Sequence, residues 1–337
     1  MALMSSRTRP LKAFLSWHNP RLRAWVYQAL LLVAVGLVAA FLVGNVLNNL
    51  AARNIATGFG FLHHEAGFAI SESVMAYSAS DTYARAIGVG LLNTLKVALT
   101  GVVLATVLGG LVGMARLVRN PLVTTLARGY IEVMRNVPLL LQLLFWYALI
   151  TEAAPPARQA IELLPGVFLS NRGLMLPWFD WQTMVWSIPV LRGFNFSGGV
   201  TISPEFLALL TGLVLYTSAF IAEIVRSGIQ SVGRGQWLAA RALGLSERQV
   251  LRAVILPQAL RVMVPPMTSQ YLNLTKNSSL AVAVGYPDIV SVVNTAINQT
   301  GQAIEGVLVI MAAYLTVSLA IAALMSGYNR RIALVIL

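Results

Sequence analysis

The stretch "AARALGLSERQVLRAVILP", residues 239–257, is charged and amphipathic in a chain that is otherwise largely apolar. Gly244 suits the end of a first short helix, where a left-handed residue is favoured. Ser246 can cap a second helix, because Gln249 stands three residues later at the spacing of a capping box. This second helix is predicted to run to Pro257. Its polar side carries Arg248 and Arg252, and its apolar side carries Leu245, Val250, Leu251, Val254 and Ile255.

Two short helices around a tight turn are typical of a DNA-reading helix-turn-helix, but the composition indicates a membrane protein. Of the 337 residues, 57% are hydrophobic and 11% are charged, which is far too apolar for an ordinary soluble domain. The net charge of +12 is compatible with nucleic-acid binding and with the basic cytoplasmic loops of a membrane protein. The positions of the basic residues along the chain decide between the two. The chain has no cysteine, which excludes disulfides, thiolate catalysis and cysteine-ligated metals.

Six windows are long and apolar enough to cross a bilayer as helices. They are 25–48, 87–114, an interrupted window 122–150, 205–225, 259–284 and 303–326. The first follows a basic N-terminus and is too long for a signal-peptide core, so it is predicted to be an uncleaved span. The sequence therefore predicts an all-α membrane protein with about six transmembrane helices.

Arginine and lysine are concentrated in four regions: before the first window, at 116–135, at 226–261 and at 330–331. If all six windows cross the bilayer, these four regions lie on the same side of the membrane. Because cytoplasmic loops are enriched in these residues, this side and both termini are predicted to be cytoplasmic. Two long segments on the other side are predicted to be periplasmic. One contains Trp178, Trp181 and Trp186, which are interpreted as interfacial anchors. The other contains His63, His64 and Glu65, which lack a third partner of fixed geometry, so no metal site is predicted.

The spans on both sides hold 239–257 against the cytoplasmic membrane surface, which removes the DNA-reading use. Two interpretations remain for a short amphipathic unit in this place. It can dock into a groove on a soluble partner, or it can lie at the interface as a structural loop.

The longer segment "GQWLAARALGLSERQVLRAVILPQAL", residues 235–260, resembles the coupling loop of permease subunits of binding-protein-dependent ABC importers. The signature of that loop is Glu-Ala-Ala, three residues, Gly, nine residues, Ile, one residue and Leu-Pro. Ala239, Ala240, Gly244, Leu256 and Pro257 match it, Val254 replaces the isoleucine, and Leu238 stands where the family usually has glutamate.

Further segments are similar to the polar amino-acid subfamily of these permeases. They are "GLLNTLKVALTGVVLATVLGGLVGMARL" (90–117), "YIEVMRNVPLLLQLLFWY" (130–147), "TSAFIAEIVRSGIQSVGRGQ" (217–236) and "NLTKNSSLAVAVGYPDIVS" (273–291). The additional first span, "LRGFNFSGG" (191–199) and the terminal "GYNRRIALV" most resemble the larger permease of general L-amino-acid importers. Those relatives usually have a longer insert before "LRGFNF", whereas here Trp186 precedes it closely.

This resemblance implies a five-helix type I importer core plus an extra N-terminal span. The implied parts are a basic cytoplasmic N-terminus (1–24), the extra span (25–50), a periplasmic segment (51–85) and the permease domain (86–331), with an insert at 151–204 and the coupling loop at 227–258. It also implies a multi-pass protein of the bacterial inner membrane that imports L-amino acids. The implied partners are a second permease subunit, favoured as a homologue, two ATPase subunits, a periplasmic amino-acid-binding protein and membrane lipid, without nucleic acid.

The resemblance assigns the ATPase contact to the loop residues Leu238, Ala239, Ala240, Arg241, Gly244, Leu245, Ser246, Arg248, Leu256 and Pro257. The chain has no Walker A pattern, so no cofactor is expected on it, and ATP and Mg²⁺ are expected on the partner ATPase. Rocking of the spans attached to the loop would give alternating access.

Polar residues inside the apolar windows indicate a solute path, because they are costly in lipid unless paired or in a wet cavity. The candidates are Glu223, Lys276, Asn273, Asn277, Ser278 and Gln142. Alternatives stay open: Glu223 can pair internally or with a loop arginine, Lys276 can pair structurally, and Gln142 can pack in the core. Lys96 can either snorkel or bind, and Gly109, Gly110 and Gly113 are predicted to permit close helix packing.

Two other functions compete with this one, an ion-gradient-driven secondary transporter and an ABC permease for another small polar solute. The former often shows internal repeats, and none is convincing here. It also leaves the docking loop without a role. No catalytic residues are predicted, because the sparse acids and three histidines offer no nucleophile with a base and no paired acids in register.

Overall fold

The computed structural model describes residues 20–52, 57–180 and 184–334. Residues 1–19 and Trp181, for which the sequence makes predictions, lie outside the described residues. The chain divides into two units, Met1–Gly58 and Phe59–Leu337. In the first unit, α1 (Pro20–Ala52) contains an apolar window, Leu22–Val46, of 25 residues, which is long enough to cross a membrane.

Four further helical segments, all in the second unit, are long and apolar enough to be spans. They are α2 (Tyr83–Ala115), α5 (Pro204–Gln230), the stretch Glu247–Val284 and α10 (Ala303–Leu334). A fifth candidate is the pair α3 (Pro121–Asn136) and α4 (Leu139–Ala148) with its π-helical end η3 (Leu149–Ala153), bent by 102°. With α1, the described residues thus contain five spans, or six if the bent pair counts as one, as the hydropathy predicts.

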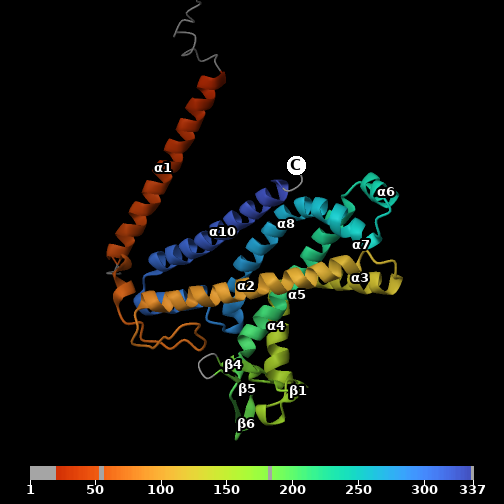
Figure 1. The fold of residues 1–337 in the computed structure, drawn as a ribbon. Helices are drawn as coiled ribbons and strands as arrows, with labels where there is room; N and C mark the ends of the chain where they lie inside the picture. The colour runs from red at the N-terminus through yellow and green to blue at the C-terminus, as the bar shows by residue number, and fades with distance from the viewer. Residues whose placement is uncertain (1–19, 53–56, 181–183, 335–337) are drawn as a thin grey trace, which may run out of the picture. The chain divides into compact units, whose positions relative to one another are not determined.

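The bend between α3 and α4 follows from Pro138. The residue before a proline is disfavoured in helical conformation, and Val137 is extended, with φ −82° and ψ 126°. The side-chain amide of Gln142 donates to the carbonyls of Met134 and Val137, both at 3.0 Å, and so satisfies backbone groups that the break leaves free. Figure 1 shows α4 turning away from α3 toward the strands.

Close packing of α2 on α5 forms the centre of the second unit. A Cβ added to Gly109 would lie 2.7 Å from Ile221 and 2.8 Å from the Ser218 carbonyl, and one added to Gly113 would lie 2.7 Å from the Ala222 carbonyl. Both glycines therefore serve the predicted close approach. Gly110 does not, because nothing lies within 4 Å of its added Cβ. The prediction is wrong at that position, since residue 110 lies on another face of the helix.

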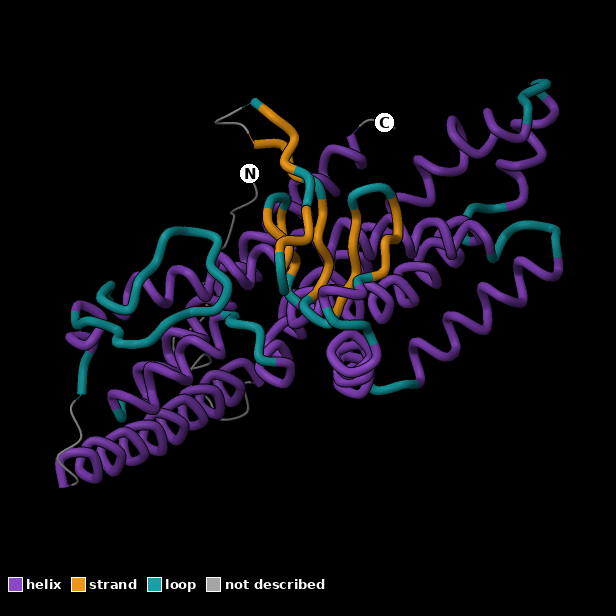
Figure 2. Tube along the Cα trace, turned by 90° about the horizontal axis from the view of Figure 1, so that it is seen from below, coloured by secondary structure: helices purple, strands orange, loops and turns teal. Residues whose placement is uncertain are grey.

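Eight short strands occupy 161–202, where the sequence predicts no sheet. Figure 2 shows them grouped on one side of the helices. Four form an antiparallel sheet in the order β1 (Ile161–Leu164), β2 (Val167–Ser170), β3 (Gly173–Leu176) and β8 (Val200–Ile202). Two hairpins lie between β3 and β8 in sequence: β4 (Trp178–Asp180) with β5 (Val185–Ser187), and β6 (Val190–Arg192) with β7 (Asn195–Ser197). The 3₁₀ turn η4 (Ala157–Gln159) precedes the sheet.

Gly173 shows why this sheet closes where it does. Its φ is +103°, and an added Cβ would lie 2.0 Å from the Ile202 carbonyl, so only glycine fits at the start of β3. Trp178 and Trp186, predicted as interfacial anchors, are 54% and 63% exposed on β4 and β5.

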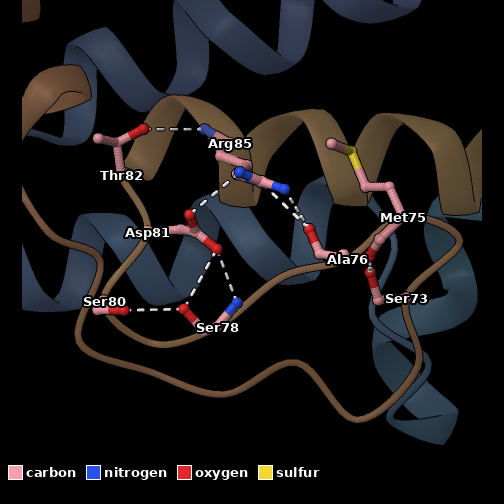
Figure 3. A network of polar contacts seen from close by, with 8 residues as sticks. All are labelled: Ser73, Met75, Ala76, Ser78, Ser80, Asp81, Thr82 and Arg85. Atoms are coloured by element: carbon pink, nitrogen blue, oxygen red, sulfur yellow. Dashed lines mark hydrogen bonds and ion pairs between the residues drawn. The ribbon is translucent and has the colours of Figure 1, made fainter.

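Residues 59–82, which lead from the start of the second unit to α2, are held in place by backbone and side-chain hydrogen bonds. This segment begins with the 3₁₀ turn η2 (Phe59–His63) and folds back on itself, with Ala66 donating to the Asp81 carbonyl at 2.8 Å. Figure 3 shows Asp81 between Arg85 and Ser78. The Asp81 carboxylate lies 3.3 Å from Arg85, accepts from the Ser78 amide at 2.8 Å, and so closes the turn that leads into α2.

Glu72 connects this segment to two spans. Its carboxylate lies 2.5 Å from Lys96 Nζ on α2 and accepts a 2.6 Å hydrogen bond from Ser203, the N-cap of α5. Lys96 also lies 4.4 Å from the centre of the Phe206 ring. Lys96 is therefore the partly exposed partner of an ion pair within the chain, where the sequence leaves snorkelling and solute binding open.

The remaining elements complete the second unit. The 3₁₀ turn η6 (Ser278–Val284) ends at Gly285 and leads to α9 (Ile289–Thr300), which packs against α2 and α10. Asp288 is the N-cap of α9 and accepts from the Ser291 amide at 2.8 Å and from the Tyr314 hydroxyl at 3.5 Å. Burial raises the pKa of Asp288 to about 7.

Candidate functional site

The loop between α5 and α8 forms as its turn residues predict. It comprises α6 (Arg234–Ala242), a turn, α7 (Glu247–Gln249) and the π-helical turn η5 (Val250–Ile255). Gly244 has φ +77° in the left-handed region, and the predicted capping box of Ser246 and Gln249 is present. The αL glycine and the capping box are thus confirmed.

One prediction for this loop is wrong. The second helix does not stop at Pro257, because α7, η5 and α8 (Leu256–Asn277) follow one another without a break. A proline interrupts a helix through its missing amide donor and its ring. Here the wider π-helical turn η5 ends two residues before Pro257. Its altered hydrogen-bond pattern lets the helix continue through the proline. The loop is therefore the beginning of the span itself.

The loop has a packed side and an exposed side. Ala240, Val250 and Ile255 are buried against Ile229, Val232, Ala259 and Met263, and the predicted apolar residues Leu245, Leu251 and Val254 pack partly buried against the same cluster. Leu238 and Leu243 are instead 65% and 80% exposed on α6 and its C-cap. Ala239, Gly244, Ser246, Arg248 and Leu256 are also exposed, Pro257 is half-buried, and Arg241 Nε lies 2.9 Å from Glu247. Two large apolar side chains are thus exposed among polar ones in this loop.

A small polar pocket lies between α5 and α8. Its volume is about 240 Å³, and it is lined by Tyr216, Thr217, Phe220, Gln270, Asn273 and Asn277. This is smaller than pockets for drug-sized ligands, which run from about 300 to 1,000 Å³, and so suits a small polar molecule.

The amide side chains of this pocket are not used by the fold. Within the described ranges, those of Gln270, Asn273 and Asn277 make no hydrogen bond to the protein, whereas Gln142 and Asn93 make two each. Each amide offers two N–H donors and a carbonyl acceptor. The lining carries no charged group, and its α5 side includes the neighbouring rings of Tyr216 and Phe220, whose centres are 5.0 Å apart. The pocket can therefore bind a carboxylate and an ammonium through neutral partners.

The structure brings only two of the predicted path residues together, namely Asn273 and Asn277. Glu223 lies on α5 beyond Phe220 and is engaged by two arginines, with Arg116 at 3.7 Å and Arg226 in a direct hydrogen-bonded pair. Lys276 is exposed beside the pocket and does not line it. Ser278 is buried and donates to the Thr275 carbonyl at 2.7 Å, and Gln142 bonds the α3–α4 break.

Four lining residues are absent from the sequence prediction. Gln270 could have been predicted from the sequence, because positions 270, 273 and 277 have the spacing of one helix face. Tyr216, Thr217 and Phe220 could not, since their role depends on α5 lying beside α8. Arg135 of α3 does not line the pocket, but its guanidinium carbon lies 4.9 Å from the centre of the Phe220 ring, which brings a positive charge close to this lining residue.

Residues 101–334 match the family model described as the binding-protein-dependent transport system inner membrane component. The chain belongs to this family. The loop described above lies within the matched range, and ATP hydrolysis in these importers is performed by separate ATPase subunits. The permease is accordingly a multi-pass membrane protein, and the secondary-transporter alternative finds no support.

Two relatives align with nearly the whole permease. It is 44% identical to YhdX of Escherichia coli, whose name places it among the amino-acid ABC transporter permeases, with 98% of this chain and 100% of that protein covered. It is 40% identical to the general L-amino acid transport system permease protein AapQ of Rhizobium johnstonii, with 94% of each covered. The alignment with YhdX extends over 391 positions, more than the 337 residues of this chain, so YhdX has residues that the permease lacks.

A solved structure shares the architecture. The crystal structure of an amino acid ABC transporter with histidines superposes with a TM-score of 0.54 and 26% sequence identity, covering 74% of this chain and 95% of that one. The helical arrangement is thus that of an ABC transporter permease.

Proposed function

We propose that the permease imports L-amino acids through the pocket between α5 and α8 and is driven by an ATPase that docks on the exposed side of the loop. The observation that carries the solute assignment is the set of three unused amides. They suit a zwitterion because neutral donors and acceptors can bind its carboxylate and ammonium together. The similarity to permeases named for amino acids supports the same class.

A neutral pocket also suits a broad range of amino acids. A fixed charge would favour side chains of the opposite sign, whereas none lines this pocket. Most of the choice among amino acids would then rest with a separate periplasmic binding protein. Glu223, Lys276, Ser278 and Gln142 stay proposals for the wider path, since none of them lines the pocket.

The exposed apolar residues of the loop support docking. Leu238 and Leu243 are large apolar side chains that are solvent-exposed on this side of the loop, which is typical of a protein contact surface. The usual glutamate at position 238 is missing, so contact there would depend on shape and apolar area. The arginines on this side, through the positive-inside rule, support a cytoplasmic location for the loop and both termini and a periplasmic one for 151–204. The proposed assembly contains a second, homologous permease subunit, two ATPase subunits that carry ATP and Mg²⁺, and the binding protein.

The docking proposal is tested with Gly244→Val in the full transporter, reconstituted in proteoliposomes with loaded binding protein. Valine at φ +77° is strained whatever the space, so the turn must change. Gly235→Val is the matched control, because Gly235 lies in α6 with no positive φ and with nothing within 4 Å of an added Cβ. Transport and stimulated ATP hydrolysis should be lost only in Gly244→Val, while the binding protein keeps its solute affinity. Equal activity of the two variants, or transport without any ATPase, contradicts the proposal.

The solute proposal is tested with Asn273→Ala combined with Asn277→Ala. This variant should transport poorly and require more solute-loaded binding protein for half-maximal rate, because donors and acceptors for the zwitterion are removed. Asn294→Ala on the exposed surface of α9 is the control and should behave as wild type. Lys276→Ala separates the pocket from its neighbour: an altered solute dependence would extend the path to Lys276. Unchanged transport in the double variant rejects the pocket.

A further inference from the structure

A larger cavity lies beside the loop, separate from the solute pocket. It has a volume of about 790 Å³ and lies between the ends of α2 and α5 and the packed side of the loop. Its inner wall is apolar, formed by residues such as Ile229, Val232 and Leu251, and its outer part includes Arg119, Arg234 and Arg241.

The charge of this cavity is positive and largely unneutralised. Arg241 is paired with Glu247, with Nε and Oε1 2.9 Å apart. Arg119 and Arg234, both exposed, have no carboxylate within 4.0 Å anywhere in the described part of the chain. Two guanidinium groups therefore remain available at the mouth of an apolar cavity. A guanidinium binds phosphate through paired N–H donors, which makes phosphate esters the favoured anions.

The cavity lies where two spans meet water. The candidate spans on α2 and α5 end at Ala115 and Gln230, and both helix ends contribute lining residues. Met114, at the end of α2, and Val118, just beyond it, are 46% and 50% exposed, so the apolar wall of the cavity continues onto an exposed apolar surface. Trp237 also lines the cavity, and indole favours the headgroup region of a bilayer. An amphiphile with its polar end near the arginines would meet apolar surface along its chains.

We propose that this cavity binds an anionic phospholipid, with its phosphate between Arg119 and Arg234 and its acyl chains along Met114, Val118 and Leu251. A soluble phosphate would leave the apolar wall unused. An acidic segment of a partner protein would have to reach past the loop to the level of the spans, whereas a lipid is already there. The site requires only that α2 and α5 cross the membrane, so it stands independently of the solute proposal.

The test is native mass spectrometry of the full transporter in detergent, titrated with phosphatidylglycerol or with phosphatidylcholine of the same acyl chains. Phosphatidylglycerol should bind at one tight site per permease, more than tenfold tighter than phosphatidylcholine. Glycerol phosphate, which has the headgroup charge without the chains, should not displace it at millimolar concentration. Comparable affinity for the two lipids would overturn the proposal, and displacement by glycerol phosphate would show a simple phosphate site instead.

The matched variants are Arg119→Gln with Arg234→Gln, and Arg128→Gln as control, since Arg128 is exposed on α3 and does not line the cavity. One basic residue near anionic lipid contributes about fivefold in affinity, so the double variant should bind phosphatidylglycerol about 25-fold more weakly. Phosphatidylcholine has the same phosphate but an added positive charge, so its binding should weaken less than that of phosphatidylglycerol, and an unchanged far-UV circular dichroism spectrum shows that the variant is folded. If the double variant keeps wild-type affinity while the control does too, the bound lipid lies elsewhere and the inference fails. If only the permease without its ATPase responds to the variant, the cavity is filled by the partner, which also refutes it.

Discussion

Replacement of Gly109 by alanine tests how α2 and α5 are held together. The added methyl group would lie 2.7 Å from the Ile221 side chain and 2.8 Å from the Ser218 carbonyl oxygen. Ordinary contacts of a carbon atom start near 3.4 Å, and a backbone carbonyl within a packed helix cannot rotate away. The two helices must therefore separate by several tenths of an ångström along their contact.

The magnitude follows from what overpacking costs. Inserting a methyl group into a tightly packed contact typically costs about 1–3 kcal/mol. The same substitution at the adjacent Gly110 has nothing within 4 Å of the added Cβ, so only the helix propensity changes, in favour of alanine by about 0.5–1 kcal/mol. The gain in helix propensity applies at both positions, so the two variants should differ in unfolding free energy by the overpacking cost of about 1–3 kcal/mol, with Gly109→Ala the less stable.

The assay is unfolding of the detergent-solubilised permease with increasing sodium dodecyl sulfate, followed by far-UV circular dichroism, for both alanine variants and wild type. Gly109→Ala should shift the midpoint to lower denaturant and Gly110→Ala should leave it unchanged or raise it. Equal shifts in the two variants would refute the assigned face of α2, because the neighbouring positions would then share one environment.

Three further predictions concern polar groups that hold the fold. Glu72→Gln should lower stability in the same assay by about 1–3 kcal/mol, because Lys96 loses its carboxylate partner in a partly enclosed site. Glu247→Gln, in the exposed pair with Arg241, should lower it by under about 1 kcal/mol. Equal losses of stability in the two variants would contradict the bridging role of Glu72. Asp288→Asn should remove a pH dependence of stability. The raised pKa of about 7 means that the folded state holds the proton more tightly than the unfolded state, so wild-type stability should fall as the pH rises from about 4 to 7 and stay level above pH 7. Asparagine still caps α9, and an unchanged slope of stability against pH in the variant would exclude Asp288 as its source. Gln142→Leu should destabilise the permease by about 1–3 kcal/mol, since the carbonyls of Met134 and Val137 lose their donor, and wild-type stability would show that water or lipid-facing groups replace it.

Local chemistry explains why the loop could be predicted from the sequence. The left-handed Gly244 and the capping box of Ser246 and Gln249 depend on residues within six positions of one another, so no tertiary information is needed. The course past Pro257 was mispredicted because a proline usually ends a helix, whereas the π-helical turn before it depends on how residues 250–255 pack against α5 and α8.

The sequence alone does not show which face of a helix packs against its neighbour, or which strands distant in sequence pair with one another. α2 is apolar on every side, so the sequence does not distinguish the packed Gly109 and Gly113 from the outward Gly110. The strands at 161–202 are only three or four residues long, and β8 reaches its partner β3 across two hairpins, so their register is fixed by contacts distant in sequence. The same limit hid Tyr216, Thr217 and Phe220, which matter only because α5 lies beside α8.

The continuity of the loop with α8 determines how motion at one site can reach the other. Asn273 lies 26 residues after Glu247 on one helical stretch, which at 1.5 Å per residue is about 39 Å. The opposite wall of the pocket belongs to α5, which the close glycine contacts hold to α2. Between loop and pocket, α8 meets α5 at Met263, whose side chain lies 2.2 Å from a Cβ added to Gly228. The loop, this contact and the pocket therefore follow one another along a single continuous helix. A displacement of the loop that moves α8 relative to α5 would shift the amides of α8 against the aromatic side chains of α5.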